Sequence, residues 1–474
     1  MSKLLWVIAL FSVLMLIGFG ASCGGESPSS ADNASNADRP VDTSPPVDSL
    51  DACGEFREGD NLNVCTATYL DEAGTAEALD VFVAGDSRVV VAKNWTPDAE
   101  ESDPSGVVVV LSPTGDEIEK TLEFDQPLRA IDVDDSANSM LIALSDHLAQ
   151  WDLEADSERW SHDIQDVDQV RFDGDLVAAS ADQRVHLFDG DGQPRTALDI
   201  DRTQVNDIAV DGERRRIYIT GFHQVDDNLQ QPFLFAYDGD GQRQWTNWDW
   251  SSQEADNLSS DTRGESVTIG RDGHLYYVGE SHGGVTTHLR APRDLDEDAP
   301  LVRRDDYSQS HNWNGAAPLG FVARLDAGTG ELDAGQLLAV RLSDGRGNAV
   351  SPQAVTANEE GTIFLGGSSA CCIERWEHKE VADQSAMPEY GGGEWTMALS
   401  PDFEERHLWT TFSGGASNVE FAGLDAGGPT MAVVHTHEAD DGDAIDIPMI
   451  TSQSLQPKPP GGPANVHLTI APTP

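Results

Sequence analysis

The stretch from residue 205 to residue 250 alternates short β-type runs with turn residues, and this pattern constrains the fold more than any other feature. The runs together are rich in Val, Ile, Tyr, Phe and Thr, which strands favour. They are Val205–Asp211, Arg216–Gly221, Phe233–Tyr237 and Gln242–Trp248, with the turn Asp238-Gly239-Asp240-Gly241 before the last. The same order recurs along most of the chain, which predicts a series of small four-stranded sheets.

Seven such sets can be traced, and each begins with a run that we expect to be the innermost strand. These runs lie near Leu79, Arg129, Asp168, Asn206, Glu265, Gln353 and Ser417. A four-stranded antiparallel blade buries its faces only against neighbouring blades, so seven blades close into a ring. The last set has no fourth strand, whereas residues 62–70 form an unassigned strand before the first set. We therefore predict an all-β, seven-bladed β-propeller over residues 53–474, closed by strand 62–70 as the outer strand of the last blade.

Three of the blades carry a more specific pattern of an "Ala-Val-Asp" strand, a "Tyr-Val-Thr-Gly" strand and a "Phe-Val-Ala-Lys-Leu-Asp" strand. This pattern resembles the bacterial β-propeller repeat abbreviated SBBP. It is carried by Ile208–Asp211, Ile217–Gly221 and Phe233–Asp238; by Leu275–Gly279 and Phe321–Asp326; and by Ile363–Gly367 and Met397–Ser400. The resemblance implies a repeat propeller but transfers no activity, because propellers host many functions.

A second family is similar in a different feature, the pairing of an aspartate with a later tryptophan. Asp152 with Trp160, and Asp238 with Trp245, look like the tryptophan-docking pairs of quinoprotein-like propellers. That family includes non-enzymatic lipoprotein scaffolds of outer-membrane assembly. Its usual eight blades and regular tryptophans are not matched here, so the resemblance is the weaker of the two.

The first residues have the pattern of an export signal. Lys3 precedes an apolar run at residues 4–19, and small residues follow before Cys23. This resembles a bacterial lipoprotein lipobox, with Gly20 where that family usually has Leu. The resemblance implies a signal peptide of residues 1–22 and an acylated Cys23, and multiple acyl chains anchor a protein stably. Because Gly24 replaces the aspartate of inner-membrane retention, we expect an outer membrane lipoprotein, facing the periplasm or the surface. Ordinary cleavage and an uncleaved anchor helix are the alternatives.

Residues 23–52 follow as a predicted disordered tether, since they are rich in Ser, Asp, Asn, Gly and Pro and contain few large apolar side chains. Four cysteines remain beyond it, and an exported protein is expected to oxidise them. The sequence allows three connectivities. The least long-range pairs Cys53 with Cys65 and Cys371 with Cys372.

The charge of the chain is extreme, with 29 Lys and Arg against 83 Asp and Glu, a formal net charge of -54. Repulsion of this size keeps a protein soluble in strong salt and destabilises it in dilute buffer. Adaptation to a saline habitat is the favoured interpretation; collection of divalent cations or of a basic partner is the alternative. Nucleic acid is an unsuitable partner, because phosphate binding requires clustered Lys and Arg.

Five of the seven sets carry an insert between the second and third strands, and this class of loop emerges on one face of a propeller. The inserts are 94–106, 222–232, 280–320, 368–394 and 437–464. Loops of this length are usually functional or disordered. We expect them to form a face that binds a protein or a glycan through exposed aromatic and histidine side chains. The candidates are Trp95, His223, His282, His311, Trp313 and Trp376. Alternatively, these side chains hold their own loops on the ring.

Catalytic and metal motifs are weak. His435 and His437 lie on one face of a predicted strand and could bind a transition metal, or they could pack between blades while nearby acids are solvated. The Asp-Gly-Asp-Gly turns lack the glycine and glutamate positions of a calcium loop. No cofactor is predicted. The sequence favours a non-enzymatic binding or scaffold protein anchored in the membrane through lipid. The alternative is a lyase, a glycoside-acting enzyme or a quinoprotein-like enzyme with a site at the channel mouth.

Overall fold

The computed structural model describes residue 56, residues 61–70 and residues 74–474, with internal gaps. The gaps are 98–102, 227–228, 256–257, 259, 283, 285, 304–316, 339, 342–346, 371–379, 382–383, 386–391, 413–417, 439–453, 457 and 460–461. The predicted signal peptide, Cys23 and the tether lie outside the described residues. No helix in the described part of the chain is long and apolar enough to cross a membrane.

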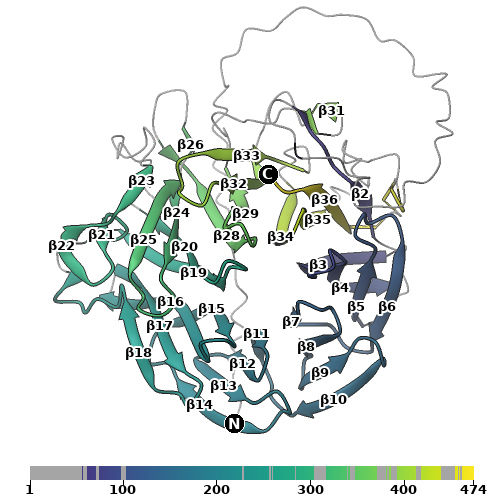
Figure 1. Cartoon of the computed structure of the whole chain (residues 1–474), viewed down its shortest axis with the longest axis horizontal. Coiled ribbons are helices and arrows are strands. Elements are labelled where there is room, and N and C mark those ends of the chain that lie inside the picture. Colours follow the sequence, from purple (N-terminus) through teal and green to yellow (C-terminus); the bar gives the residue numbers. More distant parts are fainter. Residues whose placement is uncertain are drawn as a thin grey trace, which may run out of the picture. The chain divides into compact units, whose positions relative to one another are not determined.

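Seven blades surround a central channel, and each is built on four antiparallel strands (Figure 1). Six of them come from successive parts of the chain, and the seventh combines strands from its two ends. From the channel outward, the first blade is β3 (Gly74–Val83), β4 (Val89–Pro97), β5 (Ser105–Leu111) and β6 (Ile118–Phe124). The second is β7 (Ala130–Val133), β8 (Ser139–Ala143), β9 (Leu148–Asp152) and β10 (Ser157–His162). The third is β11 (Val167–Asp173), β12 (Leu176–Ala181), β13 (Arg184–Phe188) and β14 (Pro194–Asp199).

The next three blades repeat this order. The fourth is β15 (Gln204–Asp211), β16 (Arg216–Asp226), β17 (Leu229–Asp238) and β18 (Arg243–Asn247). The fifth contains β19 (Asp261–Ile269), β20 (Leu275–His282), β24 (Pro318–Leu325) and β25 (Leu332–Leu338). The sixth is β28 (Val350–Ala357), β29 (Ile363–Ser369), β32 (Gly393–Leu399) and β33 (Arg406–Thr410). The predicted fold class is therefore confirmed.

The last blade joins the two ends of the domain, as predicted. Its strands are β34 (Val419–Gly427), β35 (Thr430–Glu438), β36 (Ala464–Pro472) and, outermost, β2 (Thr66–Tyr69). β2 is antiparallel to β36, with Thr66 opposite Ile470 and Tyr69 opposite His467. The closing strand is shorter than the predicted range 62–70, because regular pairing begins only after Cys65.

The core lies between blades, where the apolar faces of neighbouring sheets stack. Tyr276 and Val278 of the fifth blade, for example, share one buried cluster with Leu365 and Met397 of the sixth. The second strands are buried on both faces, so they are continuous β-branched runs such as Val89-Val90-Val91 rather than alternating patterns. Packing of this kind makes each blade depend on its two neighbours.

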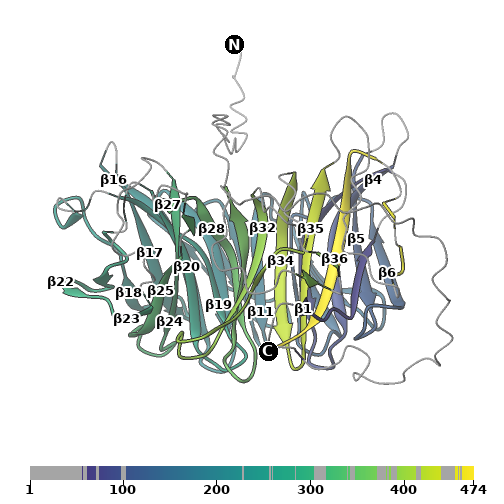
Figure 2. The ribbon, with the colours of Figure 1, turned by 90° about the horizontal axis from the view of Figure 1, so that it is seen from above.

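Several short strands were not predicted. In the fifth blade, β23 (Leu301–Arg303) pairs in parallel with the outer strand β25, so this sheet has five strands. The same insert forms the hairpin of β21 (Arg290–Ala291) and β22 (Asp294–Asp298), which lies at the outer edge of the ring in Figures 1 and 2. β26 (Val340–Arg341) pairs with β27 (Gly347–Asn348), and β30 (Glu380–Val381) pairs with β1 (Asn61–Leu62) and β31 (Gln384–Ser385).

The prediction that residues 222–232 form a loop is wrong. β16 and β17 stay paired through it, with Phe222 opposite Pro232 and Gln224 opposite Gln230. Alternating polar residues hid this pairing, because the end of the hairpin is held to the fifth blade by polar contacts, such as Gln230 N to Asp261 Oδ1 at 2.9 Å, and not by an apolar face.

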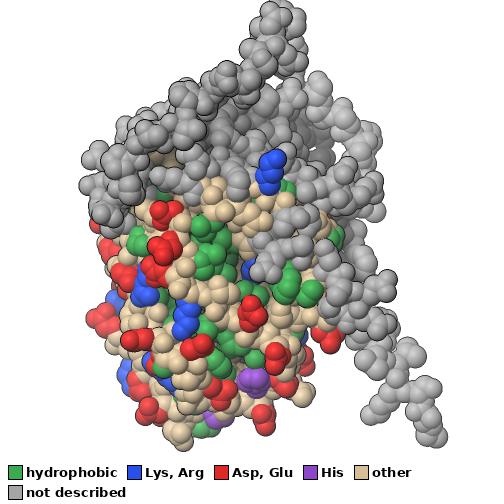
Figure 3. Space-filling model, turned by 90° about the vertical axis from the view of Figure 1, so that its right-hand side faces the viewer, with side chains coloured by type: hydrophobic (Ala, Val, Ile, Leu, Met, Phe, Trp, Pro, Cys, Tyr) green, Lys and Arg blue, Asp and Glu red, His purple; other side chains and the backbone are tan. Residues whose placement is uncertain are grey.

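The described surface is strongly acidic. Figure 3 shows Asp and Glu side chains in greater number than Lys and Arg over the side of the ring that faces the viewer. The net charge of the chain is therefore carried on the outside of the blades as well as in the channel described below.

Candidate functional site

A ring of equivalent residues surrounds one end of the channel. Six of the innermost strands contain an irregularity in register at the same position, where one residue is inserted opposite the second strand. The inserted residues are Leu79, Asp168, Asn206, Glu265, Gln353 and Ala422. Together with Arg129, which has the equivalent position in the second blade, they line a cavity of about 250 Å³. They lie near the starts of the inner strands, on the side of the loops between second and third strands. The bulges thus aim one residue per blade at this mouth.

Two glutamates of the fifth blade lie together at this mouth and have opposite pKa shifts. Burial and the charge of Glu280 raise the pKa of Glu265. Burial by itself would raise the pKa of Glu280 as well. His282, Ser351 and Arg263 stabilise the charged carboxylate, however, and bring its pKa below the usual range. The bonds are short: His282 Nε2 lies 2.7 Å from Glu280 Oε1, and Ser351 Oγ donates to Oε2 at 3.0 Å. The pair thus places a protonated and an ionised carboxyl group near each other.

The middle of the channel holds carboxyl groups from several blades around one guanidinium. Arg171 Nη2 lies 3.3 Å from Asp207 Oδ1, and Asp80, Asp132 and Asp425 are near enough to act on one another or on Arg171 electrostatically. Enclosure within the channel raises the pKa of Asp80 and of Asp132 to about 7, against the opposing effect of Arg171. This cavity has a volume of about 510 Å³.

Most of these carboxylates hold neighbouring blades together. Asp132 accepts from Phe172 N at 2.7 Å, Asp207 from Val267 N at 3.0 Å, and Asp425 from Val83 N at 2.8 Å. Each bond runs from one inner strand to the next, so it satisfies a backbone donor at the channel wall. A structural role accounts for these acids, and the raised pKa values of Asp132 and Asp425 follow from their burial at the channel wall.

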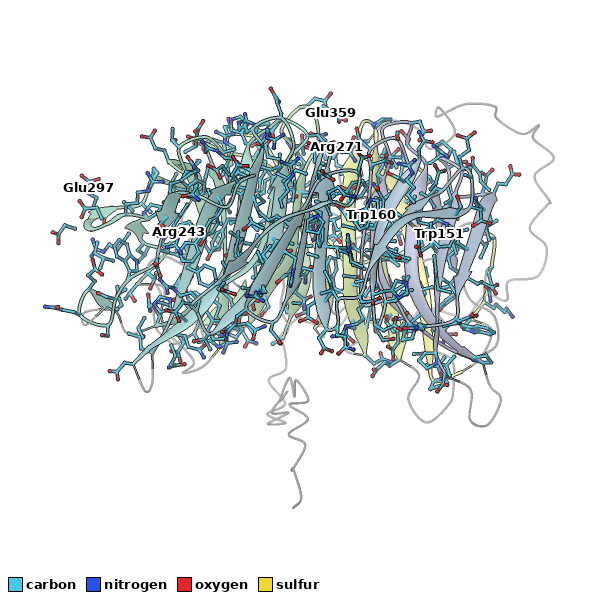
Figure 4. The ribbon with its side chains drawn as sticks, turned by 90° about the horizontal axis from the view of Figure 1, so that it is seen from below. Trp151, Trp160, Arg243, Arg271, Glu297 and Glu359 are labelled. Carbon is cyan, nitrogen blue, oxygen red and sulfur yellow. The ribbon has the colours of Figure 1, made fainter. Side chains whose placement is uncertain are left out.

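Arg271 occupies the opposite end of the channel (Figure 4). It follows β19 of the fifth blade, and its guanidinium donates to the backbone oxygens of Val83 and Ala426. It also pairs with Asp135 and with Asp425. One side chain therefore connects the fifth blade to the first, second and seventh, and it covers this end of the cavity.

A third cavity, the lateral cleft, lies between the connection from β18 to β19 and the insert of the fifth blade. Its volume is about 660 Å³. One wall consists of Trp250, Glu254 and Leu258, and the other of Thr286, Leu289, Arg290, Arg293, Asp294, Leu295 and Asp296. The insert was expected to stand on the loop-bearing face, but it extends along the outer flank of the ring and carries its hairpin there (Figure 2).

Strong local contacts fix the first wall of the cleft. Trp248 has a φ of 56°, in the left-handed region that is uncommon for a bulky residue, and its ring stacks on Tyr277 with centroids 4.7 Å apart. Arg202 then holds Asp249 with bonds of 2.8 and 2.5 Å. His223 Nε2 lies 3.0 Å from the carbonyl oxygen of Trp250. Burial lowers the pKa of His223, so the neutral ring donates this bond.

The second wall is fixed by His288 and Arg293. His288 is completely buried and stacks on Phe321 at 4.2 Å, and burial lowers its pKa to about 3. Arg293 donates from Nε to Asn247 Oδ1 at 2.7 Å and from Nη2 to Thr329 O at 2.6 Å. His288 thus pins the insert to the ring, as the alternative interpretation of the aromatic and histidine residues proposed.

The predicted binding residues do not form one group. His223 supports the lateral cleft and His282 belongs to the glutamate pair. Trp95 packs against the core of the first blade, half-buried on β4. His311, Trp313 and Trp376 lie outside the described residues, so their role stays a prediction.

The two histidines proposed as metal ligands are both buried on β35. His435 lies opposite His467, with ring centroids 4.8 Å apart, and His437 lies opposite Asn465. Burial lowers the pKa of His435 far below its usual value and that of His437 to about 4. Within the described ranges, no three Cys, His, Asp or Glu residues are grouped as metal ligands. Metal binding by this pair remains a prediction.

Cys65 is buried and takes part in a disulfide. The other cysteines, Cys53, Cys371 and Cys372 among them, lie outside the described residues. The pairing of Cys65 with Cys53 therefore remains a prediction.

Sequence reasoning missed the glutamate pair, Arg271 and the lateral cleft. Glu265 and Glu280 could not be singled out among 83 acidic residues. The cleft did have a visible signal, because Trp245, Trp248 and Trp250 lie within six residues of one another in a chain with 11 tryptophans.

Comparison with known proteins does not assign the chain to a family. No family model matches the sequence, and no curated protein matches it. The resemblance to the SBBP repeat therefore remains a prediction, whereas the ring of seven blades is seen directly.

Proposed function

We propose that this protein is an exported, lipid-anchored β-propeller that binds a ligand without transforming it. The observation that carries the proposal is the lateral cleft, a preformed cavity of about 660 Å³ between the β18–β19 connection and the insert of the fifth blade. Cavities of about 300 to 1,000 Å³ with mixed apolar and polar walls are typical of ligand sites. The SBBP resemblance, the lipobox and the acidic surface agree with a protein held outside the cytoplasm.

The binding proposal is tested by removing the insert. His282 and Pro318 are opposite each other at the ends of β20 and β24, so a short turn can replace residues 283–317. Intact and trimmed proteins would be immobilised and exposed to an oligosaccharide array and to a solubilised cell-envelope fraction. We expect the intact protein to retain a component that the trimmed, folded protein loses. Equal retention by both, or none by either, would contradict the proposal.

Lipid attachment is tested separately. In a bacterial host given labelled palmitate, the chain should become labelled and partition with membranes, and Cys23→Ser should abolish both. An unlabelled wild-type chain would contradict the anchor but leave ligand binding intact.

A second candidate function is catalysis at the loop-side mouth, favoured by the paired glutamates. Two carboxyl groups whose pKa values diverge are the usual arrangement for an acid and a base. Incubation with aryl glycosides and uronic-acid polysaccharides tests it. Turnover that Glu265→Gln and Glu280→Gln both abolish would favour an enzyme. We expect no turnover, because Glu280 is fully engaged by Ser351, His282 and Arg263.

A further inference from the structure

The lateral cleft has a mixed charge that differs from the rest of the molecule. Its lining holds the guanidiniums of Arg290 and Arg293 and the carboxylates of Glu254, Asp294 and Asp296. The ratio in the whole chain is 29 basic to 83 acidic residues. An anionic ligand would meet three carboxylates and a cationic ligand two guanidiniums. A neutral ligand with many hydroxyl groups can use both kinds of side chain as hydrogen-bonding partners.

The polar groups are held in place before any ligand arrives. Arg293 is fixed by Asn247 and Thr329, and Arg290 Nη1 lies 2.9 Å from Asp298 Oδ1. Glu254 is oriented through one oxygen only, since Ser251 N and Oγ both donate to Oε2. Groups oriented in this way lose little freedom when they bind a ligand.

Apolar surface accompanies these groups. Trp250 lines the cleft with Leu258, Leu289 and Leu295. Trp250 is only 8% exposed, and its buried indole N–H has no hydrogen-bond partner among the residues that the structure describes. A sugar offers both hydroxyl groups and an apolar C–H face, and the apolar surface of Trp250 and the three leucines is suited to that face.

We propose that the lateral cleft binds a short neutral oligosaccharide, with Trp250 as the apolar wall and Arg290, Glu254 and Asp296 as partners of its hydroxyl groups. This inference rests on the proposed binding function and names its ligand class. The cleft volume suits a short saccharide enclosed between two walls rather than an open polysaccharide surface.

The test uses the full chain in detergent and defined probes. Xylo-, cello-, malto- and chito-oligosaccharides of two to six sugars would be titrated by calorimetry, beside sulfated and deacetylated cationic analogues and a zwitterionic tripeptide. We expect at least one neutral series to bind and both charged series to bind more weakly. Its affinity should change by less than roughly twofold between low and high salt, because no net charge is neutralised.

Two variants locate the binding. Arg290→Gln should weaken it roughly 10-fold and Trp250→Ala roughly 10- to 100-fold. The matched control is Arg184→Gln, which removes an equally exposed ion pair, at 2.8 Å to Asp199, far from the cleft on the third blade. It should leave affinity unchanged. Because Trp250→Ala could disturb folding, Asp296→Asn at the exposed rim serves as a third cleft variant, and circular dichroism confirms the fold of each.

Several results would overturn the saccharide assignment: no binding of any neutral probe, stronger binding of a charged analogue or of the tripeptide, or affinity unaffected by all three cleft variants. If the oligosaccharides fail while the insert-trimmed protein still loses an envelope component, the ligand class is wrong and the binding function stands. If neither experiment shows retention, both are wrong.

Discussion

The guanidinium of Arg271, in the fifth blade, lies 3.4 Å from the carboxylate of Asp425 in the seventh. The two residues are separated by 154 positions in the chain and meet across the end of the channel. The same guanidinium bonds to the backbone of the first blade, so a single side chain ties the fifth blade to two blades on which it does not stack.

Replacing Arg271 should therefore weaken the whole ring. Arg271→Gln leaves Asp425 without its cation and two backbone oxygens without their donor. We expect a loss of about 2–4 kcal/mol in the free energy of unfolding, measured with urea. Arg184→Gln, at an exposed pair, should cost less than about 1 kcal/mol. Equal losses from the two variants would mean that the bridge contributes nothing beyond a surface pair.

The channel acids predict a distinct dependence of stability on pH. The folded-state pKa of Asp132 is about 7, above its unfolded value of 3.8, so the folded state binds the proton more tightly. The stability that Asp132 contributes is complete below about pH 4 and is lost as the pH rises to about 7. Asp132→Asn removes this dependence while its amide oxygen can still accept from Phe172 N. The variant should gain stability relative to the wild type between pH 4 and pH 7, and parallel urea curves over that range would contradict this.

The buried histidines of β35 act in the opposite direction. The pKa of His437 in the fold is about 4, below its unfolded value of 6.5, so its contribution is complete above about pH 6.5 and is lost as the pH falls to about 4. Replacement by a neutral residue, as in His437→Gln, should flatten the acid side of the stability profile. Thermal melts at half-unit pH intervals provide the measurement.

Ring closure can be tested by paired truncations. A chain that begins at Cys53 keeps β2 and should be a monomer by size-exclusion chromatography with light scattering. A chain that begins at Asp71 lacks β2 and exposes the edge of β36, which is a template for pairing between molecules. We expect the shorter chain to form oligomers or aggregates. If it stays monomeric with an unchanged melting temperature, the closing strand is dispensable.

Salt should stabilise the protein. The net charge of -54 is spread over the blades, and screening shortens from about 10 Å at 0.1 M to about 3 Å at 1 M salt. The melting temperature should rise steadily over this range in sodium chloride. A flat or falling profile would show that the acidic surface is not under repulsive strain.

The repeated part of the architecture could be predicted because each strand and its turns are encoded by residues that are close together in the sequence. Strands such as Val89–Pro97 and Arg216–Asp226 combine β-branched residues with bounding turns, and the unmatched strand before the first blade implied the closure by Thr66–Tyr69. Six of the seven positions used to mark inner strands are also the residues that line the loop-side mouth. The exception is Ser417, which precedes its equivalent Ala422 by five positions. The glycines and serine before β34 have no strand preference, so the sequence did not mark where this strand begins.

The rest depended on contacts with no local signature. β23 has three residues, and only the exposed edge of β25 makes it a strand. Arg271 lies in an ordinary turn between β19 and β20, and its importance comes from the three other blades that it reaches. The cleft needed two segments, 250–258 and 286–296, that come together only when the insert folds down the flank.

The pairing of β2 with β36 has a mechanical consequence. If the chain is held at its N-terminus, as proposed, any pull on the domain enters the ring at Thr66 and acts first on the strand that locks it. Cys65 is the residue immediately before that strand, its N–H is bonded to Ile470 O at 2.8 Å, and its sulfur is already in a disulfide. The closing strand thus begins directly after a residue that is held both by a backbone hydrogen bond to β36 and by a disulfide, at the place where a pull from the N-terminus would reach the last blade.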